Sequence, residues 1–341
     1  MTIGETPVSN NPVASRRIAG FEVSAISLGA MNVSHAYGAP TSNEHGTRLL
    51  NEALDVGYTM IDTAALYGFG ANETLVGNAI GHRRSEYLLA SKCGLHGEDG
   101  QRVMTNDPLL LKKSCEDSLQ RLQTDVIDLF YLHRWDKVTP IEDSVGMLGK
   151  LVEEGKVRAV GLSEVSANTL KKAHAVHPIA AVQSEYSLWT REPEIAILDA
   201  CRELGTTFIA FSPLARGFLC GKLRDIGTLQ EKDLRRKMPR FYPENYAKNL
   251  QLLDAFAGLA QDIGCSMGQL ALAWLLHTDS NIVPIPGTTN LNHLRENLAA
   301  ADLEIDSTAV AKANEMINRH NIVGERYVAT TQAEIDTEQF S

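Results

Sequence analysis

The chain reads LFYLH at residues 129–133, where four apolar residues precede a histidine. Two other stretches have the same form: TMID at residues 59–62 ends on an aspartate, and YLLASK at residues 87–92 ends on a lysine. Short, mainly apolar runs that contain aromatic and branched residues are typical of buried strands. Parallel strands that end on polar residues bring those side chains to one rim, and this rim carries the active site in barrel enzymes.

Strand-like runs recur along the whole chain, and helical patterns lie between nearly all of them. The runs are at residues 26–28, 59–61, 87–91, 129–132, 157–162, 180–183, 207–211 and 282–285. Residues 41–44 and 266–269 have the sequence of capping boxes, which mark helix starts. Alternating strands and helices predict an α/β fold with a parallel sheet, and eight such units favour a (β/α)8 TIM barrel.

Three segments depart from this regular pattern. Residues 16–23 indicate a short N-terminal β-hairpin, and residues 212–243 form a long loop beyond the seventh strand. Long loops at the C-terminal face of a barrel commonly serve as lids or substrate walls. The polar tail at about residues 325–341 is expected either to be disordered or to lie across the mouth. We predict a single domain over residues 1–341, with the barrel core at about 24–305.

Composition narrows the class of protein. The chain has 341 residues, 44% hydrophobic and 22% charged, and its net charge of −10 argues against nucleic-acid or anionic-membrane partners. No apolar run approaches the ~20 residues that span a bilayer, and residues 1–15 lack the apolar segment of a signal peptide. The five cysteines are scattered without metal-ligand spacing. We therefore expect a cytoplasmic protein with reduced thiols and no metal site.

Four polar residues, Asp62, Tyr67, Lys92 and His133, suggest proton transfer at a carbonyl group. A tyrosine has an ordinary pKa of about 10, and a nearby lysine ammonium lowers it. Asp62 can pair with Lys92 and keep it charged, while a neutral histidine can donate a hydrogen bond to the carbonyl oxygen. This set includes no strong nucleophile and no source of electrons, so a hydride-donating cofactor is expected.

The chain resembles the aldo-keto reductases over about residues 17–303, most closely the bacterial and fungal monomer-type branch that is also similar to potassium-channel β subunits. The motifs that carry the resemblance are GYTMIDTA at 57–64, YG at 67–68, SK at 91–92, DLFYLH at 128–133, GKVRAVGLS at 155–163, QSEY at 183–186 and FSPL at 211–214. The resemblance implies that Tyr67 is the general acid in reduction and the base in oxidation. It also implies that Lys92 and Asp62 tune Tyr67, and that His133 orients the carbonyl.

The resemblance further implies an NADPH site, with NAD as the alternative cofactor. The residues assigned to the cofactor are Gly29, Met31, Ser163, Gln183, Phe211, Ser212, Leu214, Gly217, Lys222, Gly287, Thr288, Thr289, His293, Glu296 and Asn297. Four positions depart from the common family pattern: Glu164 where Asn is frequent, Phe211 for Tyr, Gly287 for Lys and His293 for Arg. The adenosine end is therefore less basic than in strong NADPH binders.

The sequence favours an NADPH-dependent reductase that converts an aldehyde or ketone to the alcohol, reversibly. Two alternatives stay open: a nicotinamide-binding sensor with little turnover, and an aldolase that forms a Schiff base through Lys92. The expected partner is a small carbonyl or alcohol substrate, and homo-oligomer formation is left open. Tyr37 and Trp135 are candidate substrate walls. A substrate larger than a simple sugar aldehyde is suggested by the rings in the loops, Tyr37, His96, Phe218, Phe241 and Tyr242.

Overall fold

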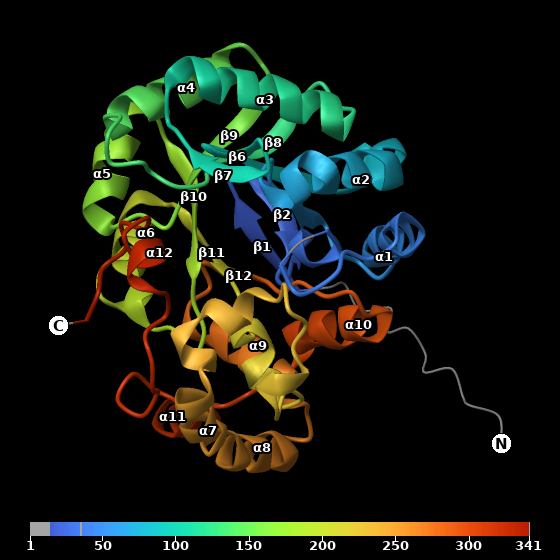
Figure 1. Cartoon of the computed structure of the whole chain (residues 1–341), viewed down its shortest axis with the longest axis vertical. Coiled ribbons are helices and arrows are strands. Elements are labelled where there is room, and N and C mark those ends of the chain that lie inside the picture. The colour runs from blue at the N-terminus through green and yellow to red at the C-terminus, as the bar shows by residue number, and fades with distance from the viewer. Residues whose placement is uncertain (1–13, 35, 341) are drawn as a thin grey trace.

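The computed structural model describes residues 14–34 and 36–340. Within this range eight parallel strands form one sheet, with helices around it (Figure 1). The strands lie in the sheet in chain order: β3 (Leu28–Gly29), β4 (Met60–Asp62), β5 (Leu88–Cys93), β8 (Ile127–Leu132), β9 (Val157–Ser163), β10 (Ile179–Glu185), β11 (Thr207–Phe211) and β12 (Ile282–Ile285). The predicted (β/α)8 architecture is confirmed, and each predicted run overlaps its strand.

Backbone contacts between the first and last strands bring the barrel close to closure. The Ser27 amide donates to the Pro284 carbonyl at 3.0 Å, and the Gly29 amide donates to the Pro286 carbonyl at 3.3 Å. A Cβ atom at Gly29 would lie 2.9 Å from the Ile285 carbonyl oxygen. Only glycine lets the two strands approach this closely without displacing backbone.

Helices surround the sheet on its outer face (Figure 1). They are α1 (Asn43–Asp55), α2 (Ala71–Ile80), α3 (Pro108–Leu122), α4 (Ile141–Glu153), α5 (Ala167–Val176), α6 (Ile197–Leu204), α7 (Pro243–Leu250), α8 (Leu252–Ile263), α9 (Met267–Thr278), α10 (Leu291–Ala299) and α11 (Ser307–Met316). The predicted capping box before α9 is confirmed between Ser266 and Gln269. The box predicted at residues 41–44 is wrong. Ser42 is the N-cap, and its side chain accepts a hydrogen bond from the amide of His45. The third helical position is therefore a histidine, whereas a capping box needs Glu or Gln there.

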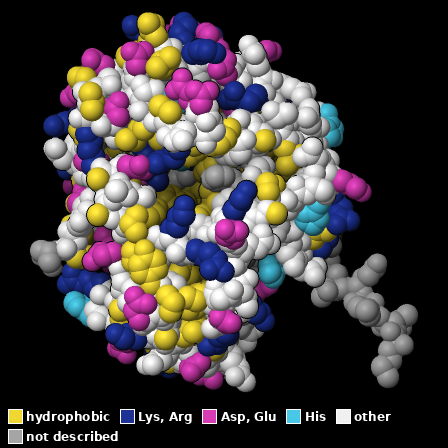
Figure 2. Space-filling model, viewed as in Figure 1, with side chains coloured by type: hydrophobic (Ala, Val, Ile, Leu, Met, Phe, Trp, Pro, Cys, Tyr) yellow, Lys and Arg dark blue, Asp and Glu magenta, His cyan; other side chains and the backbone are white. Residues whose placement is uncertain are grey.

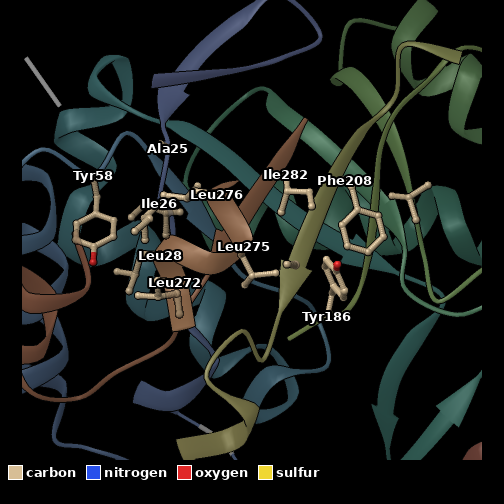
Figure 3. Close-up of a cluster of buried hydrophobic side chains, with 14 of the residues drawn as sticks. Ala25, Ile26, Leu28, Tyr58, Tyr186, Phe208, Leu272, Leu275, Leu276 and Ile282 are labelled. Carbon is tan, nitrogen blue, oxygen red and sulfur yellow. The ribbon is translucent and has the colours of Figure 1, made fainter. Parts of the chain in front are cut away.

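The main core fills the space between the sheet and the helices. In Figure 3 the α9 side chains of Leu272, Leu275 and Leu276 lie among residues that precede or belong to the strands, including Ile26 and Ile282. Because α9 buries most of its surface, it is apolar on nearly every side. Such a helix belongs to a core rather than to a surface.

A second apolar cluster fills the inside of the barrel. Strand residues such as Met60, Leu88 and Leu129 contact Ile18 and Val23, which are both fully buried. These last two belong to the antiparallel hairpin of β1 (Ser15–Ile18) and β2 (Phe21–Ser24), so the predicted hairpin is present. The packed interior leaves the carboxyl ends of the strands as the place for chemistry.

Three segments build up the mouth at those carboxyl ends. They are the hairpin β6–β7 (Leu95–Glu98 and Gln101–Met104), the loop at 212–242 and the tail with its short helix α12 (Ala329–Gln332). The tail is held in place, because Lys137 Nζ donates to the carbonyls of Ala333 and Ile335 at 2.9 and 2.7 Å. Of the two predictions for the tail, the described part fits a segment packed at the mouth. The signal-peptide prediction falls mainly on residues 1–13, outside the described range.

Candidate active site

Four elements bring the predicted polar residues together at the mouth. Asp62 ends β4, Lys92 lies near the end of β5, His133 follows β8, and Tyr67 begins a short turn, η2 (Tyr67–Gly70). Lys92 is fully buried; its Nζ donates to the Asp62 carboxylate, to the Thr63 carbonyl at 2.8 Å and to the Tyr67 hydroxyl at 3.1 Å. The second Asp62 oxygen accepts from Gln183 Nε2 at 2.8 Å. The lysine is therefore fixed against the tyrosine hydroxyl.

His133 completes this group through a contact with the tyrosine ring. The two rings meet edge to face, with centroids 5.9 Å apart. Burial, with the nearby charges of Arg134 and Lys92, holds the pKa of His133 well below its ordinary value, so the ring is neutral. Its Nδ1 is buried and has no hydrogen-bond partner among the described residues. At this buried position an unpaired ring nitrogen without a proton costs less free energy than an unpaired N–H group. The proton of the neutral ring is therefore assigned to Nε2.

The charges around Tyr67 give a result that differs from the sequence prediction. Burial raises the pKa of the Tyr67 phenol, and the Lys92 charge only partly offsets this rise. Burial also lowers the pKa of Lys92, but Asp62 and Tyr67 raise it by more, so the net direction is upward. The prediction of a lowered Tyr67 pKa is wrong for the protein without ligands, because burial raises this pKa by more than the Lys92 charge lowers it, and the Asp62 charge adds to the rise. Both groups are protonated at neutral pH.

A cavity of about 1300 Å³ opens in front of these residues. Every residue that the resemblance assigns to the cofactor lines it, as do Asp62, Tyr67, His133 and Tyr37. Lys92 lies behind the wall, fully buried. Pockets for drug-sized ligands measure roughly 300–1,000 Å³, so this cavity has room for a dinucleotide and a second molecule together.

One end of the cavity suits phosphate groups. Helix α10 begins after Asn290, whose side chain accepts from the amide of Asn292, and its first residues line the cavity together with Lys222. A helix N-terminus and an ammonium group both favour anions. The half-buried Phe211, at the end of β11, also lines the cavity. These features fit a dinucleotide with a flat ring near Phe211.

Glu164 takes a role that the sequence did not reveal. Its backbone is in the left-handed region, with φ of 56°, and its side chain points away from the cavity. One carboxylate oxygen accepts from the Glu185 amide at 2.9 Å and from Arg326 Nη2 at 2.6 Å. At this position beside Ser163, where the family pattern often has Asn, the chain has a residue that binds its own tail.

Several predicted substrate walls lie elsewhere. Trp135 packs against the core and donates from Nε1 to the Thr139 carbonyl at 2.8 Å, and it does not line the cavity. Phe218 and Phe241 are buried with Trp189 in an aromatic cluster under the 212–242 loop. His96 and Tyr242 also lie outside the lining, so among these candidates Tyr37 alone remains. The buried rings of Phe218 and Phe241 anchor the 212–242 loop through apolar contacts.

Sequence reasoning missed several residues that line the cavity, namely Arg102, Arg134, Arg216, Arg235 and Tyr327. Arg134 had a visible signal, since it directly follows His133. The others come from the long loop, the β6–β7 hairpin and the tail, whose positions only the folded chain defines.

The fold and these contacts define the class of protein. An eight-stranded barrel that holds a tyrosine against a buried lysine–aspartate pair has the arrangement that the motifs imply. The sequence model of the aldo/keto reductase family matches residues 25–318, and the chain belongs to this family.

The most informative relatives belong to the same family. The chain is 41% identical over 322 residues to an aldo-keto reductase of Schizosaccharomyces pombe named yakc [NADP(+)], covering 92% of this chain and 94% of that one. Among solved structures, the glycerol dehydrogenase of Gluconobacter oxydans superposes with a TM-score of 0.83 at 30% identity, over 92% and 99% of the two chains. A holo aldo-keto reductase of Bacillus halodurans gives 0.76 at 25% identity, over 90% and 97%. In the described range no helix is long and apolar enough to cross a membrane.

Proposed function

We propose that the protein is an NADPH-dependent reductase of aldehydes or ketones that also catalyses the reverse oxidation of alcohols. The observation that carries this proposal is the Tyr67 hydroxyl, 3.1 Å from a fully buried lysine ammonium at the wall of a cavity large enough for dinucleotide and substrate. The name of the yeast relative, which includes NADP(+), supports the choice of cofactor.

Each of the four residues has a distinct role in this proposal. The Tyr67 phenol donates its proton to the carbonyl oxygen as the alkoxide forms, and Lys92 stabilises the phenolate that is left. Asp62 holds the lysine in place and keeps it protonated despite burial. The Nε2–H of His133 donates a hydrogen bond to the same carbonyl oxygen and polarises it.

The bound dinucleotide would supply the hydride. Ser163 and Gln183 would hold its carboxamide, and the ring of Phe211 would cover its nicotinamide. Lys222 and the start of α10 would hold its phosphates. The raised pKa of Tyr67 suits the reductive direction, because the phenol stays protonated until the carbonyl oxygen gains charge.

The contacts of Lys92 weigh against a Schiff-base aldolase. An amine must be deprotonated and reach the substrate to form an imine. Lys92 is instead charged, fully buried and hydrogen-bonded to three groups.

The test compares Tyr67→Phe with Tyr87→Phe in a purified-enzyme assay that follows NADPH absorbance over a panel of aldehydes and ketones. Loss of the Tyr67 hydroxyl should lower kcat by about 10²–10⁴ while NADPH affinity stays unchanged. Tyr87 is at the opposite end of β5, and its hydroxyl makes only a 3.4 Å contact, so its variant should keep full activity. Unchanged kcat in Tyr67→Phe refutes the proposed role. NADPH binding without turnover in the parent protein supports the sensor instead.

A further inference from the structure

Arginine side chains surround the inner part of the cavity. Figure 2 shows Lys and Arg side chains beside a hollow with hydrophobic side chains in it. Three of the arginines that line the cavity have a carboxylate partner within 2.8 Å: Arg102 with Glu334, Arg216 with Glu185, and Arg235 with Asp233. Arg134 also lines the cavity and has no carboxylate partner among the described residues. Among the arginines of the lining, Arg134 is therefore the one whose charge is not paired with a carboxylate.

The guanidinium of Arg134 is held at a fixed place beside the reacting group. Its Nη1 donates to the His133 carbonyl at 2.6 Å and to the Ser163 hydroxyl at 3.0 Å. Burial is the larger influence on the pKa of His133 and of Tyr67, and the charge of Arg134 lowers both pKa values. An anion bound to Arg134 would therefore lie next to a carbonyl group held by His133.

One edge of this guanidinium remains available. The Nε and Nη2 donors make no hydrogen bond to the described residues, and neither is a buried unpaired atom. These two N–H groups point the same way and match the two oxygens of a carboxylate, which is the preferred bidentate partner of arginine. A phosphate dianion would leave one negative charge unpaired in this half-closed site.

The same cavity also has apolar side chains in its wall. Leu66, Leu95 and Leu234 line the cavity, and the ring of Tyr37 lies under Arg235. A substrate with a hydrocarbon body and a single charged end matches these surroundings. The net charge of −10 repels anions in general, so a local cation is needed to bind one.

We propose that Arg134 binds a carboxylate on the substrate, so that the protein acts on oxo acids, meaning aldehydes or ketones that carry a carboxylate. This inference rests on the proposed function, since the carbonyl of the same molecule meets Tyr67 and His133. Arg134 is then the residue that selects substrates by charge.

The kinetic test uses the NADPH-loaded enzyme with 4-carboxybenzaldehyde and its neutral methyl ester, methyl 4-formylbenzoate. The parent protein should favour the carboxylate. Arg134→Met should lower kcat/KM for the carboxylate by roughly 10- to 100-fold more than it lowers kcat/KM for the ester, mainly through KM. Arg134→Lys should restore part of the loss. The 2- and 3-carboxy isomers report how far the carboxylate lies from the carbonyl.

A matched control is Arg102→Met, which removes a cavity arginine whose charge is already paired with Glu334. It should shift the preference for carboxylate over ester far less than Arg134→Met does. An equal shift in both variants would show a general effect of charge rather than a site at Arg134. A parent protein that treats acid and ester alike, or an Arg134→Met variant that keeps the preference, overturns the inference while the reductase proposal stands.

A binding measurement separates this inference from turnover. Benzoate and benzamide are titrated against the NADPH complex of the Tyr67→Phe protein, with tryptophan fluorescence as the readout. Benzoate should bind at least tenfold tighter than benzamide, and adding Arg134→Met should abolish the difference. Equal binding of the two compounds contradicts a carboxylate site. A protein that binds benzoate through Arg134 but reduces no carbonyl loses the proposed function and keeps the anion site.

Discussion

Removing the tail residue Arg326 tests how the barrel holds its own C-terminal segment. The Arg326 side chain is 5% exposed, and its Nη2 donates to Glu164 at 2.6 Å. Its Nε lies 3.2 Å from Glu185 Oε2, an ion pair without good hydrogen-bond geometry. We expect the change Arg326→Met to leave two buried carboxylates with one cation fewer.

The two carboxylates should not suffer equally. Burial would raise the pKa of Glu185, but Arg216, Arg326 and Arg240 together lower it to about 2, so other cations remain when Arg326 is lost. Glu164 keeps only the hydrogen bond from the Glu185 amide, and its second oxygen has no partner among the described residues. Removing one member of a buried ion pair costs about 3–5 kcal/mol. We take the lower end, about 3 kcal/mol, because Glu185 stays paired.

The assay is urea unfolding at pH 7 followed by far-UV circular dichroism, with limited proteolysis of the tail as a second readout. Arg326→Met should lower the free energy of unfolding by about 3 kcal/mol and speed cleavage near residues 325–340. Adding Glu164→Gln removes the stranded charge while keeping the acceptor for the Glu185 amide, so the double variant should regain more than half of the loss. A single variant within 1 kcal/mol of the parent, or a double variant as weak as the summed singles, refutes the reasoning.

Two further predictions follow from the site and the barrel. Because the pKa of Tyr67 is raised, the rate of reduction should not change between pH 6 and 9. The rate of alcohol oxidation should rise about tenfold per pH unit toward pH 10. A plateau of the oxidation rate below pH 9 in stopped-flow assays contradicts this prediction. Gly29→Ala should lower the free energy of unfolding by roughly 1–3 kcal/mol, because its Cβ would lie 2.9 Å from the Ile285 carbonyl oxygen. Gly146→Ala, inside α4 with open space around it, should instead raise it by about 0.5–1 kcal/mol, and a loss in both variants would rule out the close-approach argument.

Much of the fold follows from local patterns in the sequence. Apolar runs of three to six residues and helix starts are short-range features, and the runs identified all eight barrel strands. The polar residues at the strand ends were equally easy to identify from the sequence, because a parallel barrel brings every carboxyl end to one rim. The structure places Asp62, Tyr67, Lys92 and His133 in contact for this reason.

The surroundings of the site depend on longer-range contacts. The pKa of Tyr67 depends on how deeply the ring is buried and on how far Asp62 engages the lysine, and neither is set by residue spacing. Phe218 and Trp135 carry rings of the kind that line pockets, yet Phe218 stacks on Trp189 and Trp135 packs against the main core. An aromatic residue in a loop buries its ring wherever the folded chain leaves apolar space.

Glu164 shows why a departure from a family pattern has to be interpreted together with distant segments. A buried carboxylate at the end of β9 is tolerable only if a cation reaches it, and Arg326 does so from 162 residues further along the chain. The tail that carries Arg326 also brings Tyr327 to the cavity wall, and Arg326 lies over the ring of Phe211 at 5.7 Å. The glutamate at position 164, beside Ser163, therefore depends on the position of the whole C-terminal segment that carries Arg326. The motif region of 17–303 is thus insufficient to define the mouth, because the partner of its most unusual residue lies beyond it.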